Sequence, residues 1–376
     1  MRAKNRRSNI IRMARDMLNM DACAIAASIR SGRQSATDVT QRVLTGLTAT
    51  DRTLNAVTHV LDQRALACAE AVDRQRDAGV CGPLAGVPFG IKDLFDVRGM
   101  VTTAGSNVLA QDPPASRDAM LVARLIAGGA IPVAMTNMDE FAYGFATDNA
   151  HYGVTRNPHD PERLAGGSSG GSAAGVAAGL FSLGLGSDTN GSIRVPASLC
   201  GIWGLRPTQG GLPTEGSYPF VPSLDTVGPF ARSVRDLRLC FEVLALRTIE
   251  QVEPGGLRCA RLGEWFAQNM APSMARAVAT LCTALGVTRT VELPDVARAR
   301  AAAYVISASE GGALHLPRLR DRAESYDPAV RDRLLAGCLV PAPVVFRAHP
   351  LRRRFRRQMP AAFASVAILI APAVPC

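Results

Sequence analysis

The sequence predicts an α/β fold with a parallel or mixed β-sheet, on three observations. Residues 87–92 form a short apolar run that is typical of a buried strand, and residues 131–135 form a second one. Between them, residues 119–127 have the spacing of a helix, with Asp118 as its predicted N-cap and two glycines at its end. A strand, a helix and a strand at this spacing indicate a βαβ unit, in which the two strands run parallel.

The remaining elements follow from the same periodicities. Residues 21–75 are predicted to form two or three helices, the clearest of which places Val39, Val43, Leu44 and Leu47 on one face. Further on, the patterns predict a helix over 172–178, a strand from Phe181 to Leu185, a loop-rich stretch over 203–230, helices over 233–247, 272–286 and 297–311, and a fully buried strand over 366–370.

Length and composition indicate a globular protein. The chain has 376 residues, 47% of them hydrophobic, and no linker-like change of composition in its middle. We therefore expect one domain over residues 21–376 after a basic N-terminal extension, residues 1–20. No apolar run reaches the ~18 residues of a membrane span. The N-terminus lacks the apolar core of a secretory signal, which predicts a cytoplasmic protein.

Charge and cysteine content restrict the classes of partner. The net charge is +10, and the densest basic run is Arg352-Arg-Arg-Phe-Arg-Arg. Arginines at helical spacing without an aromatic ladder are typical of a solvated helix face, so nucleic-acid binding is not favoured. The nine cysteines form no C-x-x-C pair and the five histidines are scattered. We expect reduced core thiols, no disulfide framework, and neither a metal nor another cofactor.

The stretch from Gly166 to Ser192 is the most informative part of the chain. It is rich in glycine and serine, as a flexible linker would be, but its apolar residues alternate between Phe181 and Leu185. The glycines therefore indicate close backbone approach. Ser168 and Ser192 each lie in such a crowded turn, next to the predicted start of a helix.

Lys92 is the second unusual feature. The chain has 42 basic residues, and every one except Lys4 and Lys92 is arginine. Unlike arginine, a buried lysine can lose its proton, which makes Lys92 a candidate general base. The alternative is a structural lysine whose stem packs while its head reaches water. Composition alone leaves both interpretations open.

Together these segments resemble the amidase signature family. Lys92 stands in Gly-Ile-Lys-Asp, Ser168 in Gly-Gly-Ser-Ser-Gly-Gly-Ser, and Ser192 in Asp-Thr-Asn-Gly-Ser-Ile-Arg-Val-Pro-Ala. The resemblance runs from about residue 21 to the last residue. It implies a central mixed sheet with helices on both faces, and amide hydrolysis by a Ser–cis-Ser–Lys triad.

The resemblance also assigns catalytic roles. Ser192 would be the nucleophile, and Ser168, on a cis peptide after Gly167, would relay its proton to neutral Lys92. Backbone N–H groups of Thr189, Asn190, Gly191 and Ser192 would form the oxyanion hole. Many family members have glycine at the position of Asn190, and asparagine tolerates the positive φ that such a turn needs.

Other residues near these motifs are weaker candidates. Tyr143 and Gly167 are predicted substrate contacts, and His151 lies in the same loop as Tyr143. Ser169 is either a hydrogen-bond donor to the triad or a helix N-cap. Asp188 is expected to hold the turn through backbone contacts. Arg194 is expected to pair with Asp188 or another carboxylate rather than to contact the substrate.

Two segments narrow the resemblance within the family: Ser187-Asp-Thr-Asn-Gly-Ser-Ile-Arg-Val-Pro-Ala-Ser-Leu-Cys-Gly and Glu310-Gly-Gly-Ala-Leu-His-Leu-Pro. With them, the sequence most resembles the 1-carboxybiuret hydrolases of s-triazine degradation. This resemblance implies a small, planar, anionic amide or ureide substrate, a homo-oligomer and a small helical partner subunit. One alternative is the glutaminase-type A subunit of a tRNA-dependent amidotransferase. Another is an inactive remnant, because the C-terminal strands and helices of the family are expected to be missing after residue 376.

Overall fold

The structure, a computed structural model, describes residues 21–252 and 256–376. The predicted N-terminal extension, residues 1–20, lies outside the described residues. Contacts divide the chain into two compact units. The first contains the described residues through Ile249 together with Asp321–Arg331, and the second contains Glu250–Arg320 and Asp332–Cys376. The single domain expected over residues 21–376 stays a prediction.

A six-stranded mixed sheet forms the centre of the first unit. Its strand order is β1-β3-β2-β8-β10-β9. The middle strand β2 pairs in parallel with both neighbours, whereas β1 and β10 pair antiparallel with β3 and β8. The strands are β1 (Val57–Val60), β2 (Pro88–Lys92), β3 (Ile131–Thr136), β8 (Leu183–Ser187), β9 (Trp203–Gly204) and β10 (Val227–Ala231). The predicted βαβ unit and mixed sheet are therefore confirmed.

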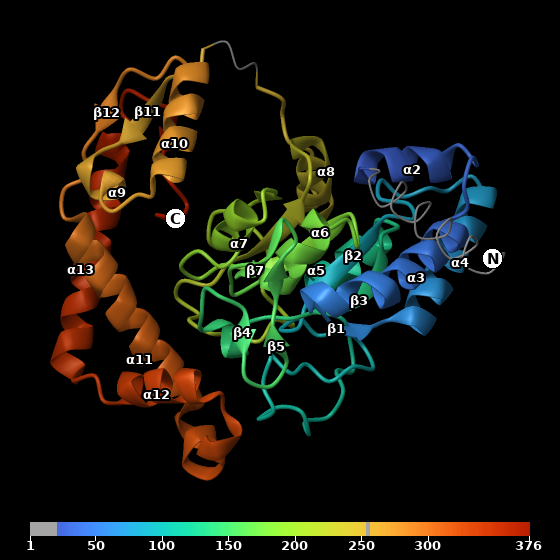
Figure 1. Ribbon diagram of the computed structural model, residues 1–376, viewed down its shortest axis with the longest axis horizontal. Helices are drawn as coiled ribbons and strands as arrows, with labels where there is room; N and C mark the ends of the chain where they lie inside the picture. Colours follow the sequence, from blue (N-terminus) through green and yellow to red (C-terminus); the bar gives the residue numbers. More distant parts are fainter. Residues whose placement is uncertain (1–20, 253–255) are drawn as a thin grey trace. The chain divides into compact units, whose positions relative to one another are not determined.

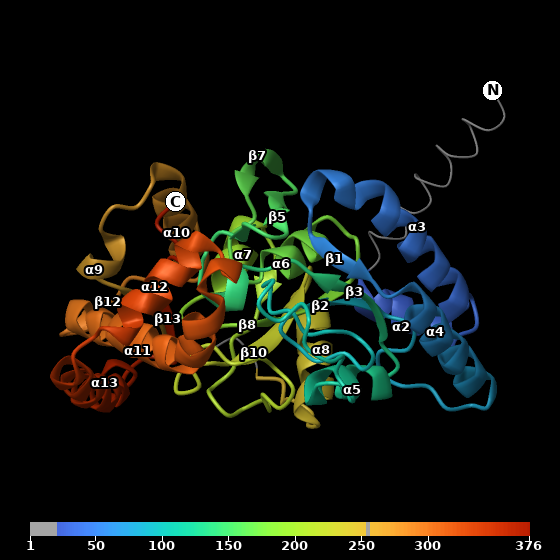
Figure 2. The same ribbon diagram turned by 90° about the horizontal axis from the view of Figure 1, so that it is seen from below.

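Helices cover the sheet of the first unit, and Figure 2 shows α6 on one side of the central strands and α5 and α8 on the other. They pack there because their apolar faces cover β2, β3, β8 and β10, in which every residue is buried. The helices are α2 (Ala22–Arg30), α3 (Ala36–Leu54), α4 (Asp62–Asp77), α5 (Met120–Ala127), α6 (Gly170–Ala177), α7 (Arg194–Leu199) and α8 (Val234–Ala245).

Short elements complete the first unit. Two hairpins, β4 (Asp148–Asn149) with β5 (Gly153–Val154) and β6 (Arg156–Asn157) with β7 (Asp160–Leu164), follow the turn η1 (Glu140–Ala142). The segment Asp321–Arg331 contains η2 (Ala323–Ser325). It is held in this unit because buried Glu140 accepts the Asp327 N–H at 2.9 Å and the Phe141 ring packs against Tyr326 at 5.4 Å.

The second unit has a small parallel sheet of its own, with β11 in the middle. Its elements are coloured from gold to red; Figure 1 labels its helices and β11 and β12, and Figure 2 labels β13. They are β11 (Cys259–Leu262), α9 (Glu264–Ala267), α10 (Pro272–Ala284), β12 (Thr290–Val291), α11 (Val296–Arg322), α12 (Pro328–Cys338), α13 (Ala342–Ala362) and β13 (Ile368–Ile370). The last residues of α11 and the first residues of α12 fall in Asp321–Arg331 and so belong to the first unit.

Four local predictions were wrong. Asp118 does not cap α5, because its carboxylate accepts bonds from Arg64 and the Arg98 N–H, and Ala119 stands at the N-cap. The helix predicted over 297–311 extends to Arg322. The predicted buried strand 366–370 is shorter, and its Ile368 is 38% exposed. Only two of the expected core thiols, Cys200 and Cys240, are buried.

Among the described residues, no single helix is long and apolar enough to cross a membrane. One pair, α12 with α13, passes that test by length and composition when joined, but it is bent by 94°.

One aromatic ring fixes α6 on the strand that carries Lys92. A β-carbon on Gly90 of β2 would lie 2.5 Å from the Phe181 ring, and one on Gly175 of α6 would lie 2.1 Å from it. Both distances are far below van der Waals contact. The two glycines therefore make the room that the fully buried Phe181 fills.

Gly90→Ala is expected to lower the free energy of unfolding by about 1–3 kcal/mol, because the added methyl overpacks the ring. Chemical denaturation checks this. Adding Phe181→Leu relieves the overlap, so the double variant should lose less than the sum of the two single losses. Additive losses would contradict the packing described for Phe181.

Candidate active site

The predicted base, Lys92, lies at the end of β2, and its side chain is fully buried. The Lys92 amine is 2.7 Å from Ser168 Oγ and 2.9 Å from Ser187 Oγ. Lys92 and Ser187 meet because β2 and β8 run parallel, so the carboxyl ends of the two strands reach the same edge of the sheet. Burial lowers the pKa of Lys92 to about 7, although the carboxylates of Asp139, Asp188 and Asp225 act in the opposite direction. The structural alternative with a hydrated head does not fit this position.

Ser168 precedes Ser169, the N-cap residue of α6, and the Gly167–Ser168 peptide is cis. A β-carbon on Gly167 would lie 2.1 Å from Asp139 Oδ2, so only glycine fits at this position. The same Asp139 oxygen accepts the N–H groups of Ala146 and Thr147 at 3.2 and 3.0 Å. The Asp139 N–H in turn donates to the Ser168 carbonyl at 3.2 Å, so Asp139 also braces the backbone that presents Ser168.

Ser192 lies in the turn between β8 and α7 and is buried, at 3% exposure. Its carbonyl accepts the Ser169 N–H at 3.3 Å, which brings this turn beside the residue that follows Ser168. The preceding Gly191 has a φ of +146°, in the region that favours glycine. The chain thus brings together Lys92, Ser168 and the backbone of Ser192.

Asp188 holds the turn that carries the predicted oxyanion hole. Its fully buried carboxylate contacts Arg194 Nη2 at 2.9 Å and Arg206 Nε at 3.1 Å, and it accepts the Ile193 N–H at 3.2 Å. Burial raises the pKa of Asp188, but the hydrogen bond and charge of Arg194 and the charge of Arg206 bring it below its usual value. The predicted Asp188–Arg194 pair is present, whereas no sequence pattern indicated Arg206 as a second partner.

The other turn residues are anchored differently. Thr189 is buried, and its hydroxyl donates to Asp225 Oδ1 at 2.6 Å. Asn190 is exposed. Asp225 also accepts the N–H groups of Phe220 and Val221, both at 2.9 Å, so it joins the turn to the loop that precedes β10.

The weaker candidates have structural contacts of their own. The Tyr143 ring packs on Phe220 with centroids 4.5 Å apart. His151 lies 3.1 Å from buried Glu140. Ser169 occupies the N-cap position of α6 without a capping bond, and its hydroxyl donates to the Ser187 carbonyl at 3.2 Å. Substrate contacts of Tyr143 and Gly167 stay predictions.

Sequence reasoning missed Ser187, Asp139 and Asp93. Ser187 directly precedes the motif that contains Ser192, Asp139 lies in Thr136-Asn-Met-Asp-Glu-Phe, and Asp93 ends Gly-Ile-Lys-Asp. These segments resemble the family, but the contacts of the three side chains were not predicted. Asp93 follows Lys92 directly. Burial raises the pKa of Asp93 to about 7, even though Thr103 donates to its carboxylate at 2.8 Å. Its burial next to Lys92 could not be seen in the sequence.

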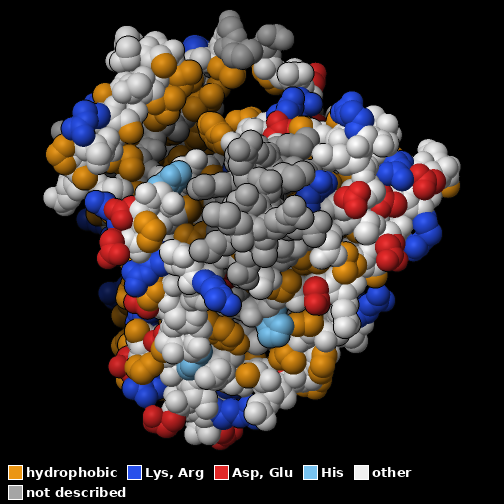
Figure 3. All heavy atoms as spheres, turned by 45° about the vertical axis from the view of Figure 1, so that its right-hand side comes forward, with side chains coloured by type: hydrophobic (Ala, Val, Ile, Leu, Met, Phe, Trp, Pro, Cys, Tyr) orange, Lys and Arg blue, Asp and Glu red, His pale blue; other side chains and the backbone are white. Residues whose placement is uncertain are grey.

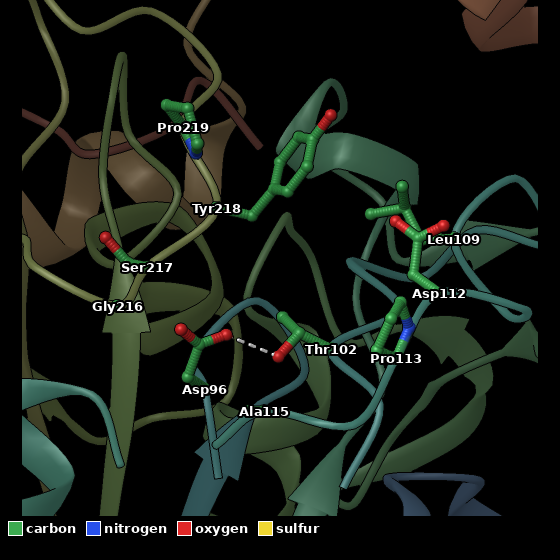
Figure 4. A pocket seen from close by; sticks show the side chains of 10 residues that line it. All are labelled: Asp96, Thr102, Leu109, Asp112, Pro113, Ala115, Gly216, Ser217, Tyr218 and Pro219. Atoms are coloured by element: carbon green, nitrogen blue, oxygen red, sulfur yellow. Dashed lines mark hydrogen bonds between the residues drawn. The ribbon is translucent and has the colours of Figure 1, made fainter. Parts of the chain in front are cut away.

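A separate hollow of about 360 Å³ lies on the same unit, lined by Asp96, Thr102, Leu109, Asp112, Pro113, Ala115, Gly216, Ser217, Tyr218 and Pro219 (Figure 4). Lys92, Ser168 and Ser192 do not line it. Two carboxylates, Asp96 and Asp112, make this hollow unfavourable for an anionic ligand. Among the described residues, no group of three or more His, Cys, Asp or Glu could hold a metal ion.

Comparisons with known proteins give matches over most of the chain. The amidase family model matches residues 38–376. The chain is 48% identical to AtzE, the 1-carboxybiuret hydrolase subunit of Pseudomonas sp. (strain ADP), over 95% of this chain and 82% of that protein. It is 35% identical to the A subunit of glutamyl-tRNA(Gln) amidotransferase from Chloroflexus aurantiacus (strain ATCC 29366 / DSM 635 / J-10-fl), over 96% of this chain and 83% of the relative.

Solved structures are similar as well. One is an inhibitor-bound complex described as a vestigial protein complex that reveals the origins of an s-triazine catabolic enzyme. It has a TM-score of 0.91 and 48% identity, and the match covers 95% of this chain and 82% of the other. A crystal structure of an amidase has a TM-score of 0.88 and 33% identity, with 95% and 82% covered.

Asp188→Asn is expected to cost about 1.5–3 kcal/mol of unfolding free energy, because a buried charged acceptor of two arginines is lost. Since the pKa of Asp188 is lowered by folding, its contribution is present above the unfolded pKa and disappears as the pH falls. Denaturation of both proteins against pH measures this.

The matched control is Asp160→Asn, which breaks a surface pair with Arg163, whose side chain is 80% exposed. It should change stability by less than about 0.5 kcal/mol. Equal losses in the two variants would contradict the role given to Asp188.

Proposed function

Because the chain belongs to the amidase family and is an amide-hydrolysing enzyme, we propose that it cleaves a C–N bond of a small amide or ureide through Lys92, Ser168 and Ser192. The observation that carries this proposal is the contact of 2.7 Å between the fully buried Lys92 amine and Ser168 Oγ. A lysine whose pKa is about 7 is neutral in a large fraction of molecules at neutral pH, as a base must be.

In the acylation step, Ser192 Oγ attacks the substrate carbonyl carbon. As the new C–O bond forms, the Ser192 proton passes to Ser168 Oγ and the Ser168 proton passes to the Lys92 amine. The tetrahedral intermediate then breaks its C–N bond. The proton held by Lys92 returns along the same path to the leaving nitrogen, which departs as ammonia or an amine. Water repeats the sequence on the acyl-enzyme and frees Ser192.

The negative oxygen of the intermediate needs fixed hydrogen-bond donors. We assign this role to backbone N–H groups of Thr189, Asn190, Gly191 and Ser192. The rigid attachment of the turn supports the assignment, because Asp188 holds it on one side and Asp225 on the other. Donors that are already oriented cost no reorganisation when the charge develops.

For the substrate we propose a small, anionic ureide such as 1-carboxybiuret. The support is the 48% identity to the 1-carboxybiuret hydrolase subunit over most of both chains. An arginine fork would suit the carboxylate of such a substrate. The acidic hollow beside Asp96 and Asp112 is a poor place for it, so we expect the substrate to bind beside Ser192.

A second candidate is the glutaminase reaction of an amidotransferase A subunit, which the 35% identity to that subunit favours. Glutamine and 1-carboxybiuret differ in shape and charge, so turnover of each distinguishes the two functions.

We also propose that the enzyme works in the cytoplasm as a homo-oligomer with a small helical partner subunit. The similar solved structure is described as a protein complex, which supports a partner. Nucleic acid is not proposed as a partner. On the part of the surface that Figure 3 shows, basic and acidic side chains are interspersed.

The substrate proposal predicts ammonia release from 1-carboxybiuret that exceeds release from biuret, glutamine and simple amides. Enzyme-coupled ammonia detection on this panel checks it. Ser192→Ala should reduce turnover of every active substrate to background, because no nucleophile remains. Preferred turnover of glutamine would support the second candidate instead.

Lys92→Met should lower kcat/KM by about 10²–10⁴-fold, because the base is lost while the buried volume is nearly kept. Lys92→Arg should fail equally, since arginine stays charged. In the unchanged protein, kcat/KM should rise as the pH increases through about 7, because the neutral amine is the active form. A Lys92→Met protein that keeps most of its turnover would exclude Lys92 as the base.

A further inference from the structure

We propose that Ser187 is a positioning residue for Lys92: its hydroxyl oxygen accepts one amine N–H and thereby directs the nitrogen lone pair toward Ser168. This inference rests on the proposed function, because it requires Lys92 to act as a base.

The contact is part of the sheet itself. Ser187 is the last residue of β8, and Lys92 is the last residue of β2. The two strands are hydrogen-bonded neighbours in parallel register, with Ile91 opposite Leu185. The position of Ser187 is therefore fixed by strand pairing, and its Oγ lies 2.9 Å from the amine in a buried environment.

A neutral amine has two N–H donors and a single lone pair. If Ser187 takes up one N–H, the lone pair can point to the Ser168 hydroxyl, from which it must receive a proton. Without Ser187, the amine can rotate about its last carbon–nitrogen bond, and the lone pair is directed to Ser168 for less of the time.

Ser187 also acts on the protonated form. An ammonium group donates to both hydroxyl oxygens, and a hydrogen bond to the charged form favours that form. The carboxylates that face the amine, Asp139 after β3, Asp188 after β8 and Asp225 before β10, act in the same direction. Loss of the Ser187 oxygen should therefore lower the pKa of Lys92 further.

The test compares kcat/KM against pH for Ser187→Ala and for the control Ser172→Ala. Ser172 is another buried serine, in α6, and its hydroxyl bonds Thr136 and the Leu185 carbonyl rather than Lys92. Ser187→Ala should lower kcat about 10- to 100-fold and move the acid limb to lower pH by about one unit. Ser172→Ala should leave the limb in place, and Ser187→Thr, which restores a hydroxyl, should recover both properties.

An unshifted limb with kcat within twofold of the unchanged protein in Ser187→Ala would overturn the inference. So would an equal shift in Ser172→Ala, because the effect would then follow from a general loss of packing. If Ser187→Ala is unstable, Ser187→Cys keeps the volume with a weaker acceptor and should show the same shift. The turnover of Lys92→Met is measured in parallel, and an active Lys92→Met protein would contradict the proposed function. If Lys92→Met is inactive but Ser187→Ala keeps the kcat and pH profile of the unchanged protein, only this inference is contradicted.

Discussion

The burial of one amine organises the site. Lys92 has no exposed surface, so its nitrogen must find partners inside the protein, and it meets two serine hydroxyls at 2.7 and 2.9 Å. Those partners require β2 and β8 to end at the same edge, and this follows from their parallel pairing. The turn with Ser168 must also approach closely, and Gly167 allows it because a side chain there would collide with Asp139. The strand order, the glycine at position 167 and the buried carboxylate of Asp139 therefore all serve to place hydroxyl partners beside the buried Lys92 amine.

Three carboxylates, those of Asp139, Asp188 and Asp225, act on this amine through their charge. Asp139 binds backbone N–H groups of residues 146 and 147, Asp188 binds two arginines, and Asp225 binds Thr189 and two backbone N–H groups. Each negative charge is taken up by a structural partner. The three negative charges raise the pKa of Lys92 through space. Burial lowers this pKa by more, so it stays near neutrality.

Much of this was predictable from the sequence, and the physical reasons for the failures are specific. The βαβ unit was correct because β2 and β3 are short apolar runs on either side of a periodic helix. Lys92 was singled out because lysine is rare in this chain, and Ser168 because it lies in a glycine- and serine-rich segment whose later apolar residues alternate. The Ser187 contact depends on strand register, which the sequence did not reveal. Asp118 was misassigned as a cap because Arg64, 54 residues earlier, competes for its carboxylate. Long-range contacts of this kind have no local signature.

The path of the chain through Asp321–Arg331 limits how the protein can be divided. This segment belongs to the first unit, while the residues on both sides of it belong to the second. The chain therefore crosses between the units three times, near residues 249, 320 and 331. A fragment that stops near residue 249 would lack Tyr326 and Asp327, which pack on Phe141 and bond to Glu140. Expression of either unit as a separate, continuous polypeptide would thus leave buried groups without their partners. To express the first unit alone, Asp321–Arg331 would have to be joined to the chain that ends at Ile249.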